Sequence, residues 1–469
     1  MIEEYYFDDF KAAGINAVRL PVTWNQHTEQ SAPYMIDSTF INRVEQVVDW
    51  ALARGLYLCL NAHHEGWLKN TNECINGQCG PTSQNQDRFN AIWLQIAQKF
   101  KDKSYNLMFE ILNEPETLPT STLNDIHRRI VQTIRTSGGN NEKRVIVFSG
   151  TKYSSNVELV EVDVPADNHT YLIANYHTYC PWSFVSDLSG NARWGSESDK
   201  DGLKAIFDMV KNWADQHDIS IMFNEWGASF DKHDYTSVMD FYQYYVKAAV
   251  DYGFAAIVWD DGFPAGFQTY ERKTRLWHGE LIDVLTNPML SANGMQAAGW
   301  FDSYGVARYA ANGGSHYVGD LSEGHWVAYR LTMSSTGGYK MDLEVSGSEE
   351  ASLSISSEDG SIQYASVKTP NTGGDQIWTT VHVALPLKVG PQTIAIKAIS
   401  GKTNLKTIKL SHSADVKVTG VSIDQPQAMV SLNNVLQLNA VILPPNARGL
   451  EEWWNLSKFI IFEFLKSHI

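Results

Sequence analysis

Two glutamates in this 469-residue chain stand where paired carboxylates could act together. Glu114 lies in LMFEILNEPE and Glu225 in ISIMFNEWGAS, and each follows an apolar run and an asparagine. Cleavage of a glycosidic bond needs such a pair, with one carboxyl group as proton donor and the other as nucleophile or base. A gap of about 5–5.5 Å between the carboxyl groups implies retention of configuration, and a wider gap implies inversion. A single glutamate after a strand could be a solvated loop charge, but a pair with the same context favours chemistry.

Three further polar residues could support this pair. Arg19, in NAVRLPVTW, could hold a catalytic carboxylate ionised by lowering its pKa. Asn113 could hydrogen-bond the 2-hydroxyl of a sugar, a contact that strengthens in the transition state. Tyr179 could orient Glu225. The alternative for Arg19 is a surface charge.

Histidines and a tryptophan follow further runs of the same kind. His63, His64 and His177 could bind sugar hydroxyls or tune the proton donor. A metal site on the histidines is disfavoured, because adjacent residues of a strand point to opposite faces and no third ligand is specified. Trp259 could form the floor under the sugar at the cleavage point, and its alternative is a core tryptophan. No metal and no cofactor are expected.

The elements that must position these residues alternate between short apolar strands and amphipathic helices over residues 1–290. The predicted strands are Ala17–Pro21, Leu56–Asn61, Leu107–Leu112, Val145–Ser149, Leu172–Tyr176, Ile219–Asn224 and Ala255–Trp259. This order predicts parallel βαβ units, and the polar residues fall at strand carboxyl ends, where a (β/α)₈ barrel carries its active site. We count seven strands and expect the first strand of the barrel to be missing before Met1. No glycine-rich phosphate loop follows a first strand, which disfavours a nucleotide-binding sheet.

The pattern changes after residue 290. Short alternating segments broken by Gly, Asn and Ser predict an all-β sandwich over residues 294–412. Residues 416–447 contain further strand-like runs. Residues 448–469 show no strand alternation and are expected to be an unrelated or disordered tail.

Composition and charge restrict the partners. The net charge of −16 argues against nucleic acid and an anionic membrane surface, and it is compatible with a neutral polymer. No stretch is long and apolar enough to span a bilayer, and no signal peptide is visible. Cys74 and Cys79 flank an Asn-Gly turn and could form a local disulfide in an oxidising compartment, whereas a metal site there lacks further ligands. Cys59 is expected to be buried, and the protein to be monomeric.

Residues 14–262 resemble glycoside hydrolase family 5 in the segments GINAVRLPVTW, LCLNAHHEGW, FEILNEP, NYHTY, IMFNEWGAS and AIVWDDG. The resemblance implies a secreted enzyme that cleaves β-1,4-linked plant polysaccharide internally and with retention. It implies that Asn113-Glu114 is the acid/base pair and that Glu225 is the nucleophile. The substrate-binding residues that it implies are Arg19, His63, His177, Tyr179 and Trp259. The chain departs from the family in lacking the first strand.

Residues 294–412 resemble carbohydrate-binding module family 6, in MQAAGWFDSYGV, GGSHYVGDLSEGHWVAYRL, TPNTGGDQIWTTV and GKTNLKTIKL. The resemblance implies Trp378 and Asn404 as ligand residues. Two positions depart from the pattern, because Ala298 stands where a glutamate is expected and Asp320 where an aromatic ring is expected. Loss of that ring predicts weakened sugar binding. Residues 416–447 resemble the start of a bacterial Ig-like repeat.

Four functions remain open at this point. The first is an endo-β-1,4-glucanase acting on cellulose or β-glucan, and the second is a mannanase or xyloglucanase on the same fold. The third is a non-catalytic carbohydrate-binding protein, which the intact pair Glu114 and Glu225 disfavours. The fourth is a nucleotide-dependent α/β enzyme, which the absent phosphate loop disfavours.

Overall fold

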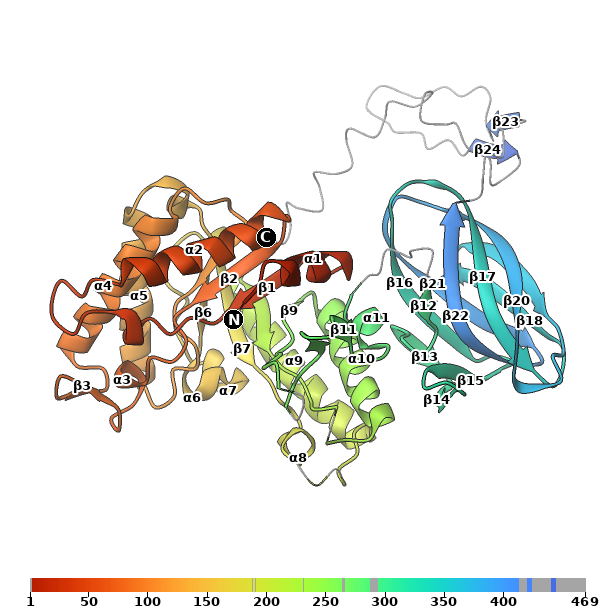
Figure 1. Cartoon of the computed structure of the whole chain (residues 1–469), viewed down its shortest axis with the longest axis horizontal. Helices are drawn as coiled ribbons and strands as arrows, with labels where there is room; N and C mark the ends of the chain where they lie inside the picture. The colour runs from red at the N-terminus through yellow and green to blue at the C-terminus, as the bar shows by residue number, and fades with distance from the viewer. Residues whose placement is uncertain are drawn as a thin grey trace. The chain divides into compact units, whose positions relative to one another are not determined.

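The computed structural model describes residues 2–187, 189, 191–230, 232–263, 266–286, 294–412, 420–423 and 440–443. Its contacts divide the chain into two compact units, of which the first is Met1–Leu276 and the second begins at Trp277. The first unit is built from strands and helices in alternation, and the second from strands (Figure 1).

The first unit is organised on a sheet of seven parallel strands in the part of the chain that is described. Its order is β1 (Ala17–Leu20), β2 (Tyr57–Asn61), β5 (Leu107–Glu110), β6 (Ile146–Ser149), β7 (Leu172–His177), β8 (Ser220–Glu225) and β9 (Ala255–Ala256). The strand β5 is buried at every position, as expected where both faces of a parallel sheet are covered. The sheet curls as an arc of a barrel, with β1 and β9 at its two ends.

Helices surround the strands of this unit (Figure 1). They are α1 (Tyr5–Ala12), α2 (Ser38–Ala53), α3 (Gly66–Lys69), α4 (Ser83–Phe100), α5 (Thr120–Thr136), α6 (Thr151–Ser154), α7 (Asn156–Leu159), α8 (Trp182–Val185), α9 (Glu197–His217) and α10 (Tyr235–Tyr252). Local sequence fixes their ends. Asp37 caps α2 by accepting a hydrogen bond from the Phe40 amide, and Ser196 and Asp199 form a capping box at α9. Each cap stabilises its helix by about 1 kcal/mol.

Two predicted strands are shorter in the structure by more than one residue. Residues Leu107–Leu112 were expected as one strand, but β5 ends at Glu110, and Glu114 lies in the loop that follows. There the Asn113 amide donates to the Ala62 carbonyl (2.9 Å), so the backbone turns across the sheet edge. Similarly, β9 covers Ala255–Ala256, and Trp259 lies beyond it with its amide donating to the Trp226 carbonyl (2.8 Å).

Small hairpins complete the loops of the unit. Strands β3 (Cys74–Ile75) and β4 (Gln78–Cys79) pair antiparallel, and a disulfide joins Cys74 to Cys79. This bond commits both thiols and excludes the metal alternative for them. Strands β10 (Tyr270–Glu271) and β11 (Leu276–Trp277) form a second pair. Cys59 is buried in β2.

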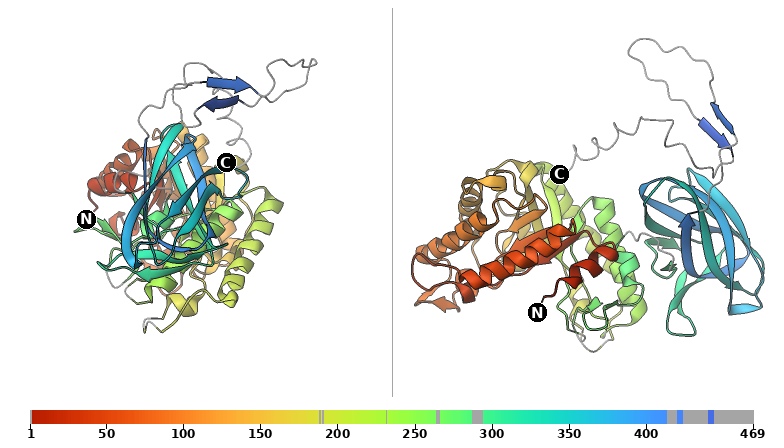
Figure 2. Two further views of the ribbon diagram at one scale, coloured as in Figure 1. Left: turned by 90° about the vertical axis from the view of Figure 1, so that its right-hand side faces the viewer. Right: turned by 45° about the horizontal axis from the view of Figure 1, so that its top comes forward.

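Residues 294–412 of the second unit form two antiparallel sheets (Figure 2). One contains β14 (Ala307–Ala310), β15 (His316–Ser322), β22 (Lys402–His412), β17 (Gly337–Gly347) and β20 (Gly374–Leu387), with β12 (Met295–Gln296) paired to β22. The other contains β13 (Asp302–Tyr304), β16 (Trp326–Met333), β21 (Gly390–Ser400), β18 (Ala351–Ser357) and β19 (Gln363–Thr369). A short helix, α11 (Leu281–Leu285), precedes them. One core cluster takes side chains from both sheets, for example Leu343 and Leu405 from the first and Leu353 and Ile394 from the second.

Most of residues 416–447 lies outside the described residues. Within that stretch the structure describes β23 (Gly420–Ile423) and β24 (Ala440–Leu443), which pair antiparallel. Residues 448–469, predicted as an unrelated tail, lie wholly outside the described part of the chain.

Candidate active site

Glu225 ends strand β8 and is held by two side chains, Arg19 from β1 and Tyr179 from the loop after β7. The Arg19 guanidinium donates from Nη1 to Glu225 Oε2 (3.1 Å), and the Tyr179 hydroxyl donates to Oε1 (3.1 Å). Both carboxylate oxygens therefore have a donor, which fixes the plane of the group. The Glu225 side chain is 11% exposed, so it faces the surface while most of it is enclosed.

A second carboxylate, Glu110, shares Arg19 and was not predicted as a site residue. Arg19 donates from Nε to Glu110 Oε2 (2.7 Å) and from Nη2 to Oε1 (2.6 Å), a bidentate pair in which the side chains are 3% and 2% exposed. Burial would raise the pKa of Glu110, but the adjacent guanidinium lowers it to about 2. Glu110 is therefore ionised and neutralises the buried cation.

Glu114 lies in the loop after β5, opposite Glu225. Its backbone φ is +40°, a left-handed conformation that costs a non-glycine residue about 1–3 kcal/mol and recurs at functional sites. Its Oε1 lies 2.9 Å from His177 Nδ1. Burial raises the pKa of Glu114, and the His177 hydrogen bond and charge together lower it below its ordinary value.

The two carboxylates of the predicted pair approach closely. One ligand atom each of Glu114, His177 and Glu225 lies within 4.8 Å of the others. In addition, His177 Nδ1 lies 3.6 Å from Glu225 Oε2. A register shift between β7 and β8 brings His177 opposite Glu225, a displacement typical of β-bulges beside active sites.

Asn224 connects Glu110 to His177, the neighbour of Glu114, through buried hydrogen bonds. Its Nδ2 donates to Glu110 Oε2 (2.8 Å), and its Oδ1 lies 3.0 Å from His177 Nε2. Because Oδ1 can only accept, His177 donates from Nε2, and in the neutral ring Nδ1 is then the acceptor. A protonated Glu114 could donate to that nitrogen, and an ionised Glu114 could accept from a protonated ring.

The remaining predicted residues lie around the same strand ends. Asn113 accepts from Arg19 Nη2 through Oδ1 (2.7 Å), so its Nδ2 is the part that could meet a ligand. His63 is 6% exposed and its ring is parallel to that of Trp259, with centroids 6.1 Å apart. Burial first, and then Arg19, lower the pKa of His63 to about 2, so this ring is neutral. His64 is exposed and packs edge-on against His63.

Two missed residues carried a signal in the sequence. Glu110 stands inside the apolar run LMFE, and Asn224 inside IMFN. A charged or amide side chain in a strand buried on both faces must find a polar partner, because burial without one is costly. The apolar run LMFE could therefore have predicted that Glu110 has a polar partner, although it could not have named Arg19, which is 91 residues away.

Glu114, His177 and Glu225 could also offer three ligand atoms to a metal ion. The guanidinium of Arg19 lies 3.1 Å from Glu225, so a fixed cation already stands beside this donor set. A second cation beside the first would be repelled. The donor set therefore favours acid–base chemistry by the carboxylates.

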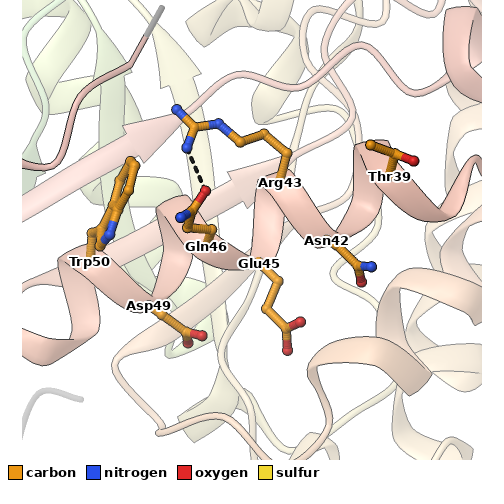
Figure 3. A pocket seen from close by; sticks show the side chains of 7 residues that line it. All are labelled: Thr39, Asn42, Arg43, Glu45, Gln46, Asp49 and Trp50. Carbon is orange, nitrogen blue, oxygen red and sulfur yellow. Dashed lines mark hydrogen bonds between the residues drawn. The ribbon is translucent and has the colours of Figure 1, made fainter.

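A surface hollow of about 450 Å³ lies elsewhere on the unit. Figure 3 shows that its seven lining residues all project from α2, and that Arg43 donates to Gln46 there. The lining is charged and polar apart from Trp50, comes from a single outer helix and contains none of the residues of the site. We do not assign this hollow to the chemistry.

In the second unit, the predicted ligand residues come from two strands. Trp378 is half-buried on β20, and Asn404 on β22 is 3% exposed. Asn404 Nδ2 donates to the Ser346 hydroxyl (3.3 Å) and to the Asp375 carbonyl (3.2 Å). Both amide hydrogens are thus used internally, and Asn404 fixes the backbone three residues before Trp378.

A pair of carboxylates at the carboxyl edge of a parallel sheet, with Glu225 buried and Glu114 partly exposed, is the make-up of a two-carboxylate glycoside hydrolase. Residues 2–263 match the family described as Cellulase (glycosyl hydrolase family 5), so the chain belongs to glycosyl hydrolase family 5. Residues 296–412 match the family described as Carbohydrate binding module (family 6).

Named relatives agree with this assignment. Endoglucanase H of Acetivibrio thermocellus is 41% identical over 290 residues, which cover 61% of this chain and 30% of that protein. Endoglucanase B of Clostridium cellulovorans is 32% identical over 295 residues, which cover 58% of this chain and 64% of that protein. The chain therefore spans less than two thirds of these relatives. The crystal structure of endoglucanase Cel5A from Thermotoga maritima aligns with a TM-score of 0.55 at 27% identity, over 61% of this chain and 90% of that one.

Within the part of the chain that is described, no helix combines the length and the apolar character needed to cross a bilayer.

Proposed function

We propose that the chain is a retaining endo-β-1,4-glucanase in which Glu225 is the nucleophile and Glu114 the acid/base. The observation that carries the proposal is the approach of the two carboxylates within 4.8 Å, each with its own positioning partner. That gap leaves no room for a water between nucleophile and sugar, as inversion would require. It supports retention.

The contacts support a role for each group in two displacements. Glu225 attacks the anomeric carbon while Glu114 gives its proton to the leaving glycosidic oxygen, which releases the first product. Glu114, now ionised, removes a proton from water, and the resulting hydroxide displaces Glu225 with a second inversion. Arg19 and Tyr179 hold Glu225 in position throughout.

The sugar-binding residues remain proposals as well. Nδ2 of Asn113 would meet the 2-hydroxyl, since its Oδ1 is occupied by Arg19. Trp259 would lie under the sugar at the cleavage point, with His63 parallel to it. His63 and His64 would bind hydroxyls.

Substrate choice is tested by a panel of carboxymethylcellulose, glucomannan, xyloglucan and xylan. We expect the highest kcat/KM on carboxymethylcellulose, because the named relatives are endoglucanases. Mannan is the second candidate, since the Thermotoga maritima Cel5A structure was also determined with mannotriose. The first-formed product should carry the β configuration, which NMR of the anomeric proton detects within the first turnovers. An α product formed first would exclude the proposed mechanism.

The pH dependence of the enzyme should respond to His177. Its hydrogen bond lowers the pKa of Glu114, and Glu114 must be protonated to act as the acid. Replacing His177 with Gln should therefore raise that pKa and move the basic limb of the kcat/KM profile upward, by about one pH unit. The exposed His169 provides the matched control, and His169→Gln should leave the limb in place. An unchanged basic limb in His177→Gln would mean that His177 does not set the pKa of Glu114.

We also propose that the sheet of the first unit is an arc of a (β/α)₈ barrel spanning residues 1–290, and that residues 294–412 form a carbohydrate-binding sandwich. The module would keep the catalytic unit on its polymer. For residues 416–447 we propose an Ig-like repeat, which the antiparallel β23–β24 pair supports. A polymer substrate and the Cys74–Cys79 disulfide support action outside the cell.

A further inference from the structure

Three aromatic side chains form a row across the six-stranded sheet of the second unit. Tyr309 on β14 stacks on Tyr317 of β15, with ring centroids 5.7 Å apart and planes 25° apart. Tyr317 in turn meets Trp378 of β20, with centroids 5.3 Å apart. Tyr309 is 43% exposed, Trp378 is half-buried and Tyr317 is buried between them. The row therefore offers an apolar surface made of rings from three strands.

The Tyr309 side chain is held at its hydroxyl and along its ring, although it is exposed. Its hydroxyl donates to Asp320 Oδ2 (2.5 Å), and Asp320 Oδ1 accepts from Lys402 Nζ (2.7 Å). Its ring lies over Gly319, where an added Cβ would come 2.4 Å from ring carbon Cδ2. Asp320 has a φ of +57° within an irregular stretch of β15, a conformation that aspartate tolerates better than most residues. The local backbone thus places a carboxylate where it holds the tyrosine.

Trp378 at the other end of the row is also held by its neighbours. The Lys406 ammonium lies 5.4 Å from its ring centroid, and Lys406 Nζ lies 3.6 Å from Glu344 Oε1. The Asn312 amide, in the β14–β15 turn, donates to the Gln376 side chain (2.8 Å), two residues before Trp378. This bond connects the hairpin of Tyr309 directly to the strand of Trp378.

The charges beside the row are compensated. Asp320 is paired with Lys402, and Lys406 with Glu344. A charged ligand would find no free counter-charge among these four groups. Aromatic faces with fixed polar groups at their rim suit the C–H faces and hydroxyls of a neutral sugar chain.

We infer that Tyr309, Tyr317 and Trp378 form the carbohydrate-binding surface of this unit, and that its ligand is a β-1,4-glucan chain. Tyr309 supplies, from β14, the ring that the sequence predicted to be lost at Asp320 on β15. Asp320 becomes the group that positions this ring. The inference rests on the proposed function of the second unit and names its site.

The test uses native electrophoresis of the whole chain in gels with and without hydroxyethylcellulose, in the Glu225→Ala background so that the polymer stays intact. We expect Tyr309→Ala to weaken retardation about tenfold, equal to about 1.4 kcal/mol, and Trp378→Ala at least as much. Tyr309→Phe keeps the ring and should retain most of the binding. Gly319→Ala keeps the tyrosine but displaces its ring, and should fall between the two.

Tyr304→Ala is the matched control, because Tyr304 is 64% exposed on β13 of the other sheet. It should bind like the unsubstituted chain, and retardation in gels with xylan should be weaker throughout. Binding by Tyr309→Ala equal to that of Tyr304→Ala would overturn the inference, as would stronger retardation by xylan. Absence of retardation in the Glu225→Ala parent would overturn it too. Hydrolysis of carboxymethylcellulose by the unsubstituted chain tests the proposed catalysis separately.

Discussion

Replacing Glu225 with Ala should abolish hydrolysis of carboxymethylcellulose. We expect kcat/KM to fall by roughly 10⁴-fold or more, which corresponds to about 5.4 kcal/mol of transition-state stabilisation. The carboxylate is the group that would form the covalent bond to the sugar, and Ala removes the acceptor of the Tyr179 hydroxyl and one of the acceptors of Arg19. A reducing-sugar assay measures the loss. Glu197→Ala is the control, because Glu197 is an exposed carboxylate on α9, with its side chain 85% exposed.

Azide distinguishes the two glutamates. In Glu225→Ala, azide can enter the vacated space and attack the anomeric carbon, and Glu114 still protonates the leaving group. The product should be a glycosyl azide of inverted configuration. In Glu114→Ala with an activated aryl cellobioside, Glu225 still forms the intermediate, and azide should give a product of retained configuration. Identical stereochemistry in both variants, or full activity of Glu225→Ala, would falsify the assignment.

Much of the first unit could be predicted from apolar runs, since inner strands such as β5 and β6 are buried at every position, on both faces of the sheet. The strand ends were less predictable. Leu107–Leu112 is uniformly apolar except for Glu110, yet pairing stops at Glu110 because the backbone turns toward Ala62. Apolar character reports burial, and residues such as Ile111 are buried in the loop as well.

The approach of Glu114 to Glu225 was predictable, because each follows an apolar run and an asparagine. The sequence suggested Arg19 as a partner of a catalytic carboxylate, and the structure adds that its main partner is Glu110. Spacing along the chain cannot decide which of several strand carboxylates a guanidinium meets, because sheet curvature and register set those distances. In the second unit, matching the chain to the family pattern one position at a time did not point to Tyr309, because its ring reaches over Gly319 from the adjacent strand.

Replacing Glu110 with Gln should destabilise the first unit strongly. Gln keeps the side-chain volume, but it removes the negative charge that compensates Arg19. Its NH₂ group would also face a donor, either the Arg19 guanidinium or Asn224 Nδ2, in place of the acceptor that they have now. Breaking a buried pair of this kind costs about 3 kcal/mol or more, which lowers Tm by roughly 9 °C for a unit of this size. Calorimetry of the first unit's transition measures the change. Asp49→Asn is the matched control, because Asp49 pairs with Lys103 at 51% exposure and should cost less than about 1 kcal/mol.

The Arg19–Glu110 pair should make the stability difference between the unsubstituted chain and Glu110→Gln depend on pH within a defined range. The pKa of Glu110 is about 2 in the folded chain against an ordinary value of 4.5. A carboxyl group whose folded pKa is lowered stabilises the fold above its unfolded pKa, and this contribution is lost as the pH falls through the folded pKa. The Tm difference between the unsubstituted chain and Glu110→Gln should therefore be constant above about pH 4.5 and shrink progressively towards pH 2. A difference that stays undiminished at pH 3 would mean that Arg19 is not the origin of the destabilisation, and that the loss in Glu110→Gln comes from packing instead.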